Sequence, residues 1–150
     1  MASLLPFIQE REIRSFSAGN TLIDQGAPTS ELLVLVSGQV EVLRDGVRVA
    51  KASEPGVVFG EMSALLGGNA TATVRALSDA KVCVISEPRD FLMDHPEASL
   101  FVAELLAKRL DSLNRYLIDV QRQYEGHDHI GMVDEVLDSL MHRPHKPSAV

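Results

Sequence analysis

Apolar positions alternate with polar ones, between turn residues, over the first part of the chain up to about residue 86. Residues 3–10 predict a short helix. Residues 31–36 predict a buried strand that ends at Ser37-Gly38, and Val40 and Val42 alternate with polar residues in the next. Asp45-Gly46 predicts a two-residue hairpin, because a type I′ turn needs positive φ at both central positions. Strands at this spacing, without long helices between them, predict a sandwich or barrel.

One helical segment interrupts the predicted strands. Residues 61–66 are helix formers that follow a glycine, between a strand that ends at Phe59 and a strand over residues 71–77. We therefore expect one or two helical turns inside a β-roll.

After residue 86 the apolar period becomes helical. Pro96 and Glu97 predict the start of a helix and Gly126 its end, giving about 28 residues and a length of about 42 Å. Apolar residues recur on it at alternating steps of three and four, as an a/d seam of Ala103, Leu106, Leu110, Leu113, Leu117, Val120 and Tyr124. The seam covers the β-roll or pairs two copies in a homodimer, and we favour pairing because the seam is longer than the edge of a roll. Off the seam, Leu100, Phe101 and Leu105 are expected to dock on the roll.

A second amphipathic stretch follows the long helix and ends before Pro144. Its apolar face holds Ile130, Val133, Val136, Leu137 and Leu140. We expect a first domain over residues 1–124, with the long helix over about 97–124, and a short helix and tail over 125–150. The face of residues 130–140 is a candidate surface for a protein partner.

Composition restricts the function classes. A chain of 150 residues, 45% of them apolar, is the size of one globular domain that needs neither metal nor disulfide. Its charge of 14 − 21 = −7 repels nucleic-acid backbones on average. The single Cys83 lies in an apolar run and is expected to be a small buried hydrophobe. With neither an export signal nor a run of about eighteen apolar residues, the sequence predicts a cytoplasmic protein that does not span a membrane.

Neither metal binding nor catalysis is expected. The four histidines near the end of the chain stand in a segment typical of a solvated loop and tail: His127, His129, His142 and His145. The sequence has no Walker loop and no dinucleotide fingerprint, and Glu61 has no second carboxylate close by in sequence for acid/base chemistry. We therefore predict a protein that is not an enzyme.

The segment around residues 59–76 has the character of an anion site. Gly60 opens the short helix, which leaves backbone N–H groups free at the helix start and lets a ligand approach the backbone. Glu61 in the first turn has a simpler explanation, since a carboxylate there interacts favourably with the helix dipole.

This segment resembles the phosphate-binding cassette of the cyclic nucleotide-binding domain, the sensor of the catabolite activator protein (Crp/Fnr) superfamily. Phe16-Ser17-Ala18-Gly19, Leu22 to Gly26 and Val34 to Val42 follow the order of that family, so the resemblance covers residues 3 to about 124. It implies a mainly β jelly roll (a double-stranded β-helix) with flanking helices and a long C-terminal dimerisation helix, as a stand-alone sensor without a helix-turn-helix domain.

The resemblance also implies a ligand site. In the family, the positions of Gly60 and Glu61 hold the ribose hydroxyl, the amides of Met62, Ser63 and Ala64 hold the cyclic phosphate, and an arginine followed by a hydroxyl residue completes the phosphate site. The hydroxyl here is Thr71, flanked by Ala70 and Ala72. The family's long helix closes over the base, which brings the region of Asn114 and Arg115 toward the ligand.

The arginine is replaced by Ala70. Arg75 is not a substitute, because five residues along a strand is about 16 Å. Charge-assisted hydrogen bonds contribute about 1.5 to 3 kcal/mol each, and losing roughly 3 kcal/mol weakens binding about 150-fold. No cofactor is certain from the sequence; we expect weak binding of cAMP or cGMP, or binding of another small ligand with less negative charge.

Three functions follow as alternatives. The first is a dimeric, ligand-sensing regulatory module that signals through its C-terminal helices. The second is a protein-interaction scaffold that has lost small-molecule sensing, which Ala70 favours. The third and weakest is a transcription regulator of the Crp/Fnr type that acts with a partner. Direct DNA binding is not expected, because the segment after Tyr124 predicts one helix rather than two and is acidic.

Overall fold

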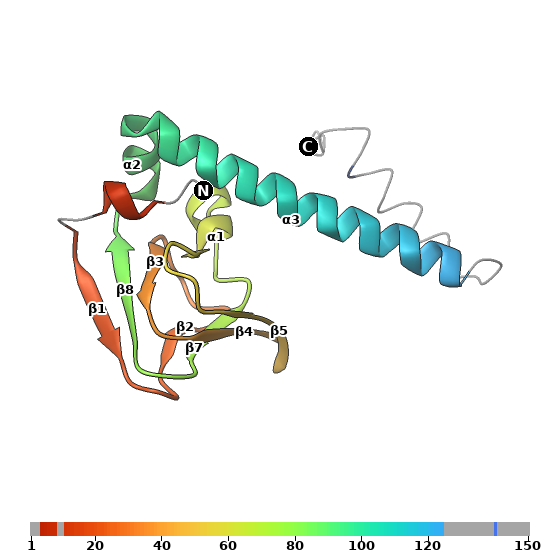
Figure 1. Ribbon diagram of the computed structural model, residues 1–150, viewed down its shortest axis with the longest axis horizontal. Helices are drawn as coiled ribbons and strands as arrows, with labels where there is room; N and C mark the ends of the chain where they lie inside the picture. Colours follow the sequence, from red (N-terminus) through yellow and green to blue (C-terminus); the bar gives the residue numbers. More distant parts are fainter. Residues whose placement is uncertain (1–3, 9–10, 125–139, 141–150) are drawn as a thin grey trace, which may run out of the picture. The chain divides into compact units, whose positions relative to one another are not determined.

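The computed structural model describes residues 4–8, 11–124 and 140, and divides into two compact units, Met1–Phe101 and Val102–Val150. The first unit contains all the described strands and the short helices, and the long helix α3 begins in it (Figure 1). The amphipathic stretch expected at residues 130–140 lies outside the described residues, apart from Leu140.

Two four-stranded antiparallel sheets make up the first unit. One has the order β1-β8-β3-β6, from Ile13–Phe16, Ala80–Ile85, Leu32–Ser37 and Val58–Phe59. The other has the order β2-β7-β4-β5, from Thr21–Ile23, Thr73–Ala76, Val40–Arg44 and Val47–Ala52. The mainly β jelly roll with a long C-terminal helix is confirmed.

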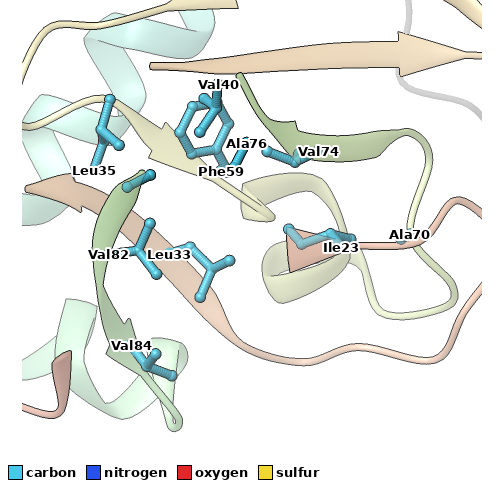
Figure 2. Close-up of a cluster of buried hydrophobic side chains, with 11 residues drawn as sticks. Ile23, Leu33, Leu35, Val40, Phe59, Ala70, Val74, Ala76, Val82 and Val84 are labelled. Atoms are coloured by element: carbon cyan, nitrogen blue, oxygen red, sulfur yellow. The ribbon is translucent and has the colours of Figure 1, made fainter. Parts of the chain in front are cut away.

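The core lies between the two sheets, where inward-facing side chains of both meet (Figure 2). Leu35 and Val82 enter it from the first sheet and Val40 and Val74 from the second, each at most 4% exposed. Because side chains alternate along a strand, the residues next to these four in sequence point to the outer faces of the sheets. Cys83 is fully buried, as expected, and burial raises the pKa of its thiol.

The hairpin between β4 and β5 forms at Asp45-Gly46, with φ of 52° and 79°, the two positive values that the sequence predicts. Gln25 fixes its tip: the Gln25 Nε2 donates to Asp45 Oδ1 at 2.8 Å, and the Asp45 backbone N–H donates to Gln25 Oε1 at 2.9 Å. The turn that leads into the start of the edge strand β5 is therefore held by side-chain hydrogen bonds as well as by the backbone hydrogen bonds between β4 and β5.

The helices agree with the sequence in part. A 3₁₀ turn, Leu5–Phe7, stands where a short helix was expected, α1 spans Glu61–Leu66, and α3 spans Pro96–Gln123. Helix α2, Pro88–Asp94, was not predicted. The docking expected for Leu100 is wrong: Leu100 is 60% exposed, whereas Ala98, about 200° away around the helix, is fully buried. No helix among the described residues is long and apolar enough to cross a membrane.

Candidate functional site

Gly60 makes the turn from β6 into α1. Its φ is 85°, in the left-handed region, and a Cβ atom there would lie 2.7 Å from the backbone oxygen of Glu31. Both the conformation and the close approach therefore require glycine. This tight turn sets the direction in which the first amides of α1 leave the strand.

Helix α1 is short and is closed at both ends by backbone bonds. The Ala64 N–H donates to the Gly60 oxygen at 3.0 Å, and the Gly67 N–H donates to the Ser63 oxygen at 2.9 Å. Glu61 and Ser63 are buried, at 7% and 6% exposed, while Met62 is 44% exposed. The Ser63 hydroxyl donates to the backbone oxygen of Asn69 at 3.1 Å, which ties the helix to the loop that follows it.

Ala70 is held on its main chain as well as on its side chain. Its N–H donates to the Ala27 oxygen at 2.9 Å, and its oxygen accepts from the Gly26 N–H at 2.8 Å. The methyl group is 7% exposed and belongs to the same buried cluster as Ile23 and Val74 (Figure 2). At the position where the resemblance implies a guanidinium, the structure has an apolar contact with the core.

The remaining predicted residues lie on the same segment but differ in exposure. Thr71 is exposed and Ala72 is half-buried, in the bend before β7. The structure thus brings the start and the end of the cassette together through the bond between Ser63 and Asn69. It leaves the Thr71 hydroxyl on the solvent side of that bend.

Arg75 is committed to the outer face of the second sheet. Its neighbours Val74 and Ala76 point into the core, and its Nε and Nη2 both donate to Glu41 Oε2, at 2.9 and 2.8 Å. The other oxygen, Oε1, accepts from Arg48 Nε at 2.8 Å. These hydrogen bonds, first to Arg75 and then to Arg48, lower the pKa of the Glu41 carboxyl. Arg75 therefore does not replace the missing arginine.

Sequence reasoning missed this group of two arginines around one glutamate. Val40 and Val42 in the predicted strand already place Glu41 on the outer face, but Arg75 is 34 residues away in sequence. The partner follows only from the register, in which Glu41 stands opposite Arg75 in β7 and Lys51 in β5. The Arg48 contact could have been predicted from the sequence, because the two-residue turn at Asp45-Gly46 pairs Arg48 with Leu43 and so places it on the same face as Glu41.

An open cavity of about 700 Å³ lies beside the cassette in the first unit. Its lining mixes polar groups with a slightly larger share of apolar surface, and comes from the loop after β2, the end of the cassette and the residue after β8: Pro28, Thr29, Ser30, Glu31, Gly68, Asn69 and Ser86. The one carboxylate there, Glu31, accepts two bonds from Arg14, at 3.1 and 3.0 Å, which raise the pKa of Arg14. The hydroxyl groups of Thr29, Ser30 and Ser86 and the amide of Asn69 are its uncharged polar side-chain groups.

The predicted seam of the long helix is exposed at four positions and half-buried at Leu106, Leu117 and Val120. None of the seven seam residues is buried, and Leu110, Leu113 and Tyr124 are 41%, 46% and 41% exposed. Arg115, which the resemblance places toward the ligand, pairs with Asp111 one turn earlier, at 3.0 Å.

Within the described part of the chain, no three His, Cys, Asp or Glu side chains gather closely enough to hold a metal. The four histidines of the sequence analysis lie outside the described residues.

Three comparisons agree on the family of this fold. The model of the "Cyclic nucleotide-binding domain" family matches residues 13–92, which is more than half of the chain. Glutaminase 2 of Bradyrhizobium diazoefficiens is 38% identical over 110 residues, and the CRP-like cAMP-activated global transcriptional regulator of Mycobacterium tuberculosis is 28% identical over 111. The Thermus thermophilus catabolite activator protein shares the fold, with a TM-score of 0.65 at 23% identity, over 93% of this chain and 80% of that one.

The curated relatives are longer than this chain. The match covers 67% of this chain and 17% of the glutaminase, and 70% of this chain and 50% of the mycobacterial regulator. The chain therefore spans half or less of the length of these two relatives.

Proposed function

Because the chain belongs to the cyclic nucleotide-binding domain family, we propose that it is a ligand-sensing regulatory module whose cyclic nucleotide binding is weakened or altered. The observation that carries this proposal is Ala70. Its methyl group is buried in the core at the position of the phosphate arginine, and Arg75 is bonded to Glu41 on the outer face. A cyclic phosphate at the start of α1 would have backbone amides to bind it but no arginine from the cassette segment, residues 60–72.

The retained features support a site that still accepts a ligand. Gly60 keeps the left-handed turn, and Glu61 keeps its buried place in the first turn of α1. The neighbouring cavity, where hydroxyl and amide groups lie beside apolar surface, suits a small ligand with less negative charge than a cyclic nucleotide. The proposed ligands are therefore cAMP or cGMP at low affinity, or such a small polar molecule.

The substitution Ala70→Arg tests the role of the missing cation. Restoring a guanidinium is expected to tighten binding of cAMP or cGMP by about 150-fold, the equivalent of roughly 3 kcal/mol. The measurement is the midpoint of thermal unfolding across a panel of cyclic nucleotides. Ala18→Arg is the matched control, because it adds the same charge at an exposed alanine outside the cassette.

The outcome separates two accounts of the site. A thermal shift that appears in Ala70→Arg and not in Ala18→Arg supports the proposal. A folded Ala70→Arg protein without any shift would mean that the site has diverged beyond its one cation. Because Ala70 is buried, a melting curve without nucleotide first establishes that the variant folds.

The output that we propose runs through a homodimer. Pairing of the α3 seams would bury the apolar side chains that a single chain exposes, and a ligand would act by favouring one arrangement of the helices over another. This role is regulatory rather than catalytic, and we place it in the cytoplasm.

The buried Ala70 methyl also favours a second candidate, an interaction scaffold that has lost small-molecule sensing. It would present residues 130–140 to a protein partner. A regulator of transcription that acts with a partner, as the name of the mycobacterial relative suggests, is a weaker candidate. A gel shift at low salt tests the expectation that the chain does not bind DNA directly, since specific DNA binding by the chain alone would overturn it.

A further inference from the structure

We propose that the outer face of the second sheet, at its edge strand β5, binds an acidic extended peptide of a partner protein as an additional strand. The proposal rests on three features of this face, independent of the cassette: a free strand edge, a group of cations held in place by Glu41, and a fixed hairpin tip. We call the face formed by Glu41, Arg48, Lys51 and Arg75 the basic face.

No strand among the described residues pairs with the outer edge of β5. The strand pairs with β4 on one side and is the last in the order β2-β7-β4-β5 (Figure 1). Five of its six residues are exposed, including Val47 and Val49 at 64% and 60%. A strand edge presents unpaired N–H and C=O groups, and added peptides gain affinity from these and from apolar side chains beside them.

A buried carboxylate orients two cations of the basic face, Arg48 in β5 itself and Arg75 two strands away in β7. The Glu41 side chain is 4% exposed and accepts bonds from both arginines, whose side chains remain 47% and 44% exposed. Arg48 gives Glu41 its Nε–H, and among the described residues its two Nη groups have no acceptor. The guanidinium is thus held by one edge while its outer edge is directed to solvent, where it can bind a carboxylate with two bonds.

The local charge of the basic face is opposite to that of the whole chain. Lys51 stands opposite Glu41 in the register and so projects on the same side as the two arginines. Three cations against one anion give a local charge of +2, in a protein of net charge −7. At physiological salt, charges are screened over about 8 Å, so a bound segment experiences the nearby cations more than the distant acids.

Side-chain hydrogen bonds hold the β4–β5 hairpin in one conformation before any peptide binds. Gln25 exchanges two bonds with Asp45 at the tip and donates its own N–H to the Thr73 hydroxyl at 3.0 Å. An edge that is already ordered loses little conformational freedom when a strand adds to it. Acidic side chains on the added strand would meet Lys51 and Arg48, while its apolar ones would cover the exposed valines.

Fluorescence polarisation with defined peptides tests the proposal on the full chain. The probe is a labelled ten-residue peptide in which glutamate and valine alternate. We expect saturable binding of this peptide and none of its lysine–valine counterpart. Lys51→Glu is expected to weaken binding about ten-fold or more, since it reverses one charge on the basic face. Lys81→Glu is the matched control, an exposed lysine of β8 in the other sheet, and is expected to change affinity less than about two-fold.

Two further probes test the kind of partner. Two versions of the acidic peptide, one with N-methyl groups on the glutamates and one with them on the valines, remove the N–H donors of opposite sides of the strand, so one of them should lose binding. Unchanged binding of both versions, or equal loss in Lys51→Glu and Lys81→Glu, would overturn the proposal. It would also be overturned by a single-stranded ten-nucleotide DNA that binds more tightly than the acidic peptide, which would identify the face as a nucleic-acid surface.

Discussion

At position 70 a methyl group packs in the core, whereas a guanidinium would bind an anion. The Ala70 methyl closes the buried cluster next to Ile23 and Val74, and the main chain of the same residue exchanges two bonds with residues 26 and 27. A long cationic side chain at this position would exchange that apolar contact for a contact with an anion. In the proposed account, this one residue changes both the packing of the cassette and its affinity for a phosphate.

Gly60 is the second residue on which the cassette depends. We expect Gly60→Ala to lower the free energy of unfolding by about 3 kcal/mol or more, because the new Cβ meets a backbone oxygen in addition to the cost of positive φ. Gly19→Ala is the control, since its φ is +89° with nothing within 4 Å, and should cost about 1 to 2 kcal/mol. Urea unfolding measures both, and equal losses would contradict the close approach to Glu31.

The lowered pKa of the Glu41 carboxyl leads us to expect that the free energy of unfolding depends on pH in the acid range. Its folded pKa is lowered by the hydrogen bonds from Arg75 and Arg48, so this group stabilises the fold above its unfolded pKa, and the contribution is lost as pH falls through the folded value. We expect Glu41→Gln to reduce the decline in unfolding free energy between about pH 5 and about pH 2. Exposed Glu54 provides the control as Glu54→Gln, and a decline identical in wild type and Glu41→Gln would be the contrary result.

At the scale of elements, local signals were sufficient where the residues of an element determine it. Asp45-Gly46 gave the hairpin and the glycine before residue 61 gave α1, because each depends on φ values that few residues adopt. Helix α2 was missed because its seven residues are too short to show a helical period, although Pro88 stands at its first turn. The basic face was missed because it depends on strand pairs that join residues far apart in sequence.

The seam of α3 makes a prediction at the same scale. Leu113→Asp is expected to convert a dimer to a monomer, because it places a charge in the centre of the paired apolar seam. Leu100→Asp makes the same change on the same helix at an exposed position off the seam, and should leave the dimer intact. Light scattering on a sizing column gives the mass, and a wild-type mass of one chain would contradict the dimer.

At the scale of the whole molecule, the first unit combines a shared fold with a site that we propose to be altered. The two sheets, the core and α1 agree with the family, which is why the resemblance in sequence predicted the architecture. What the sequence left open is how the altered position is accommodated. The structure shows that accommodation as a buried methyl group and a main chain bonded on both sides, neither of which a residue type alone reveals.

The most direct test of the central claim is calorimetric titration of the unaltered chain with cAMP and with cGMP. Weakened binding predicts dissociation constants near the millimolar range for both nucleotides, because a micromolar site that loses roughly 3 kcal/mol weakens about 150-fold. A micromolar constant for either nucleotide would contradict the claim that replacing the phosphate arginine by Ala70 disables the site.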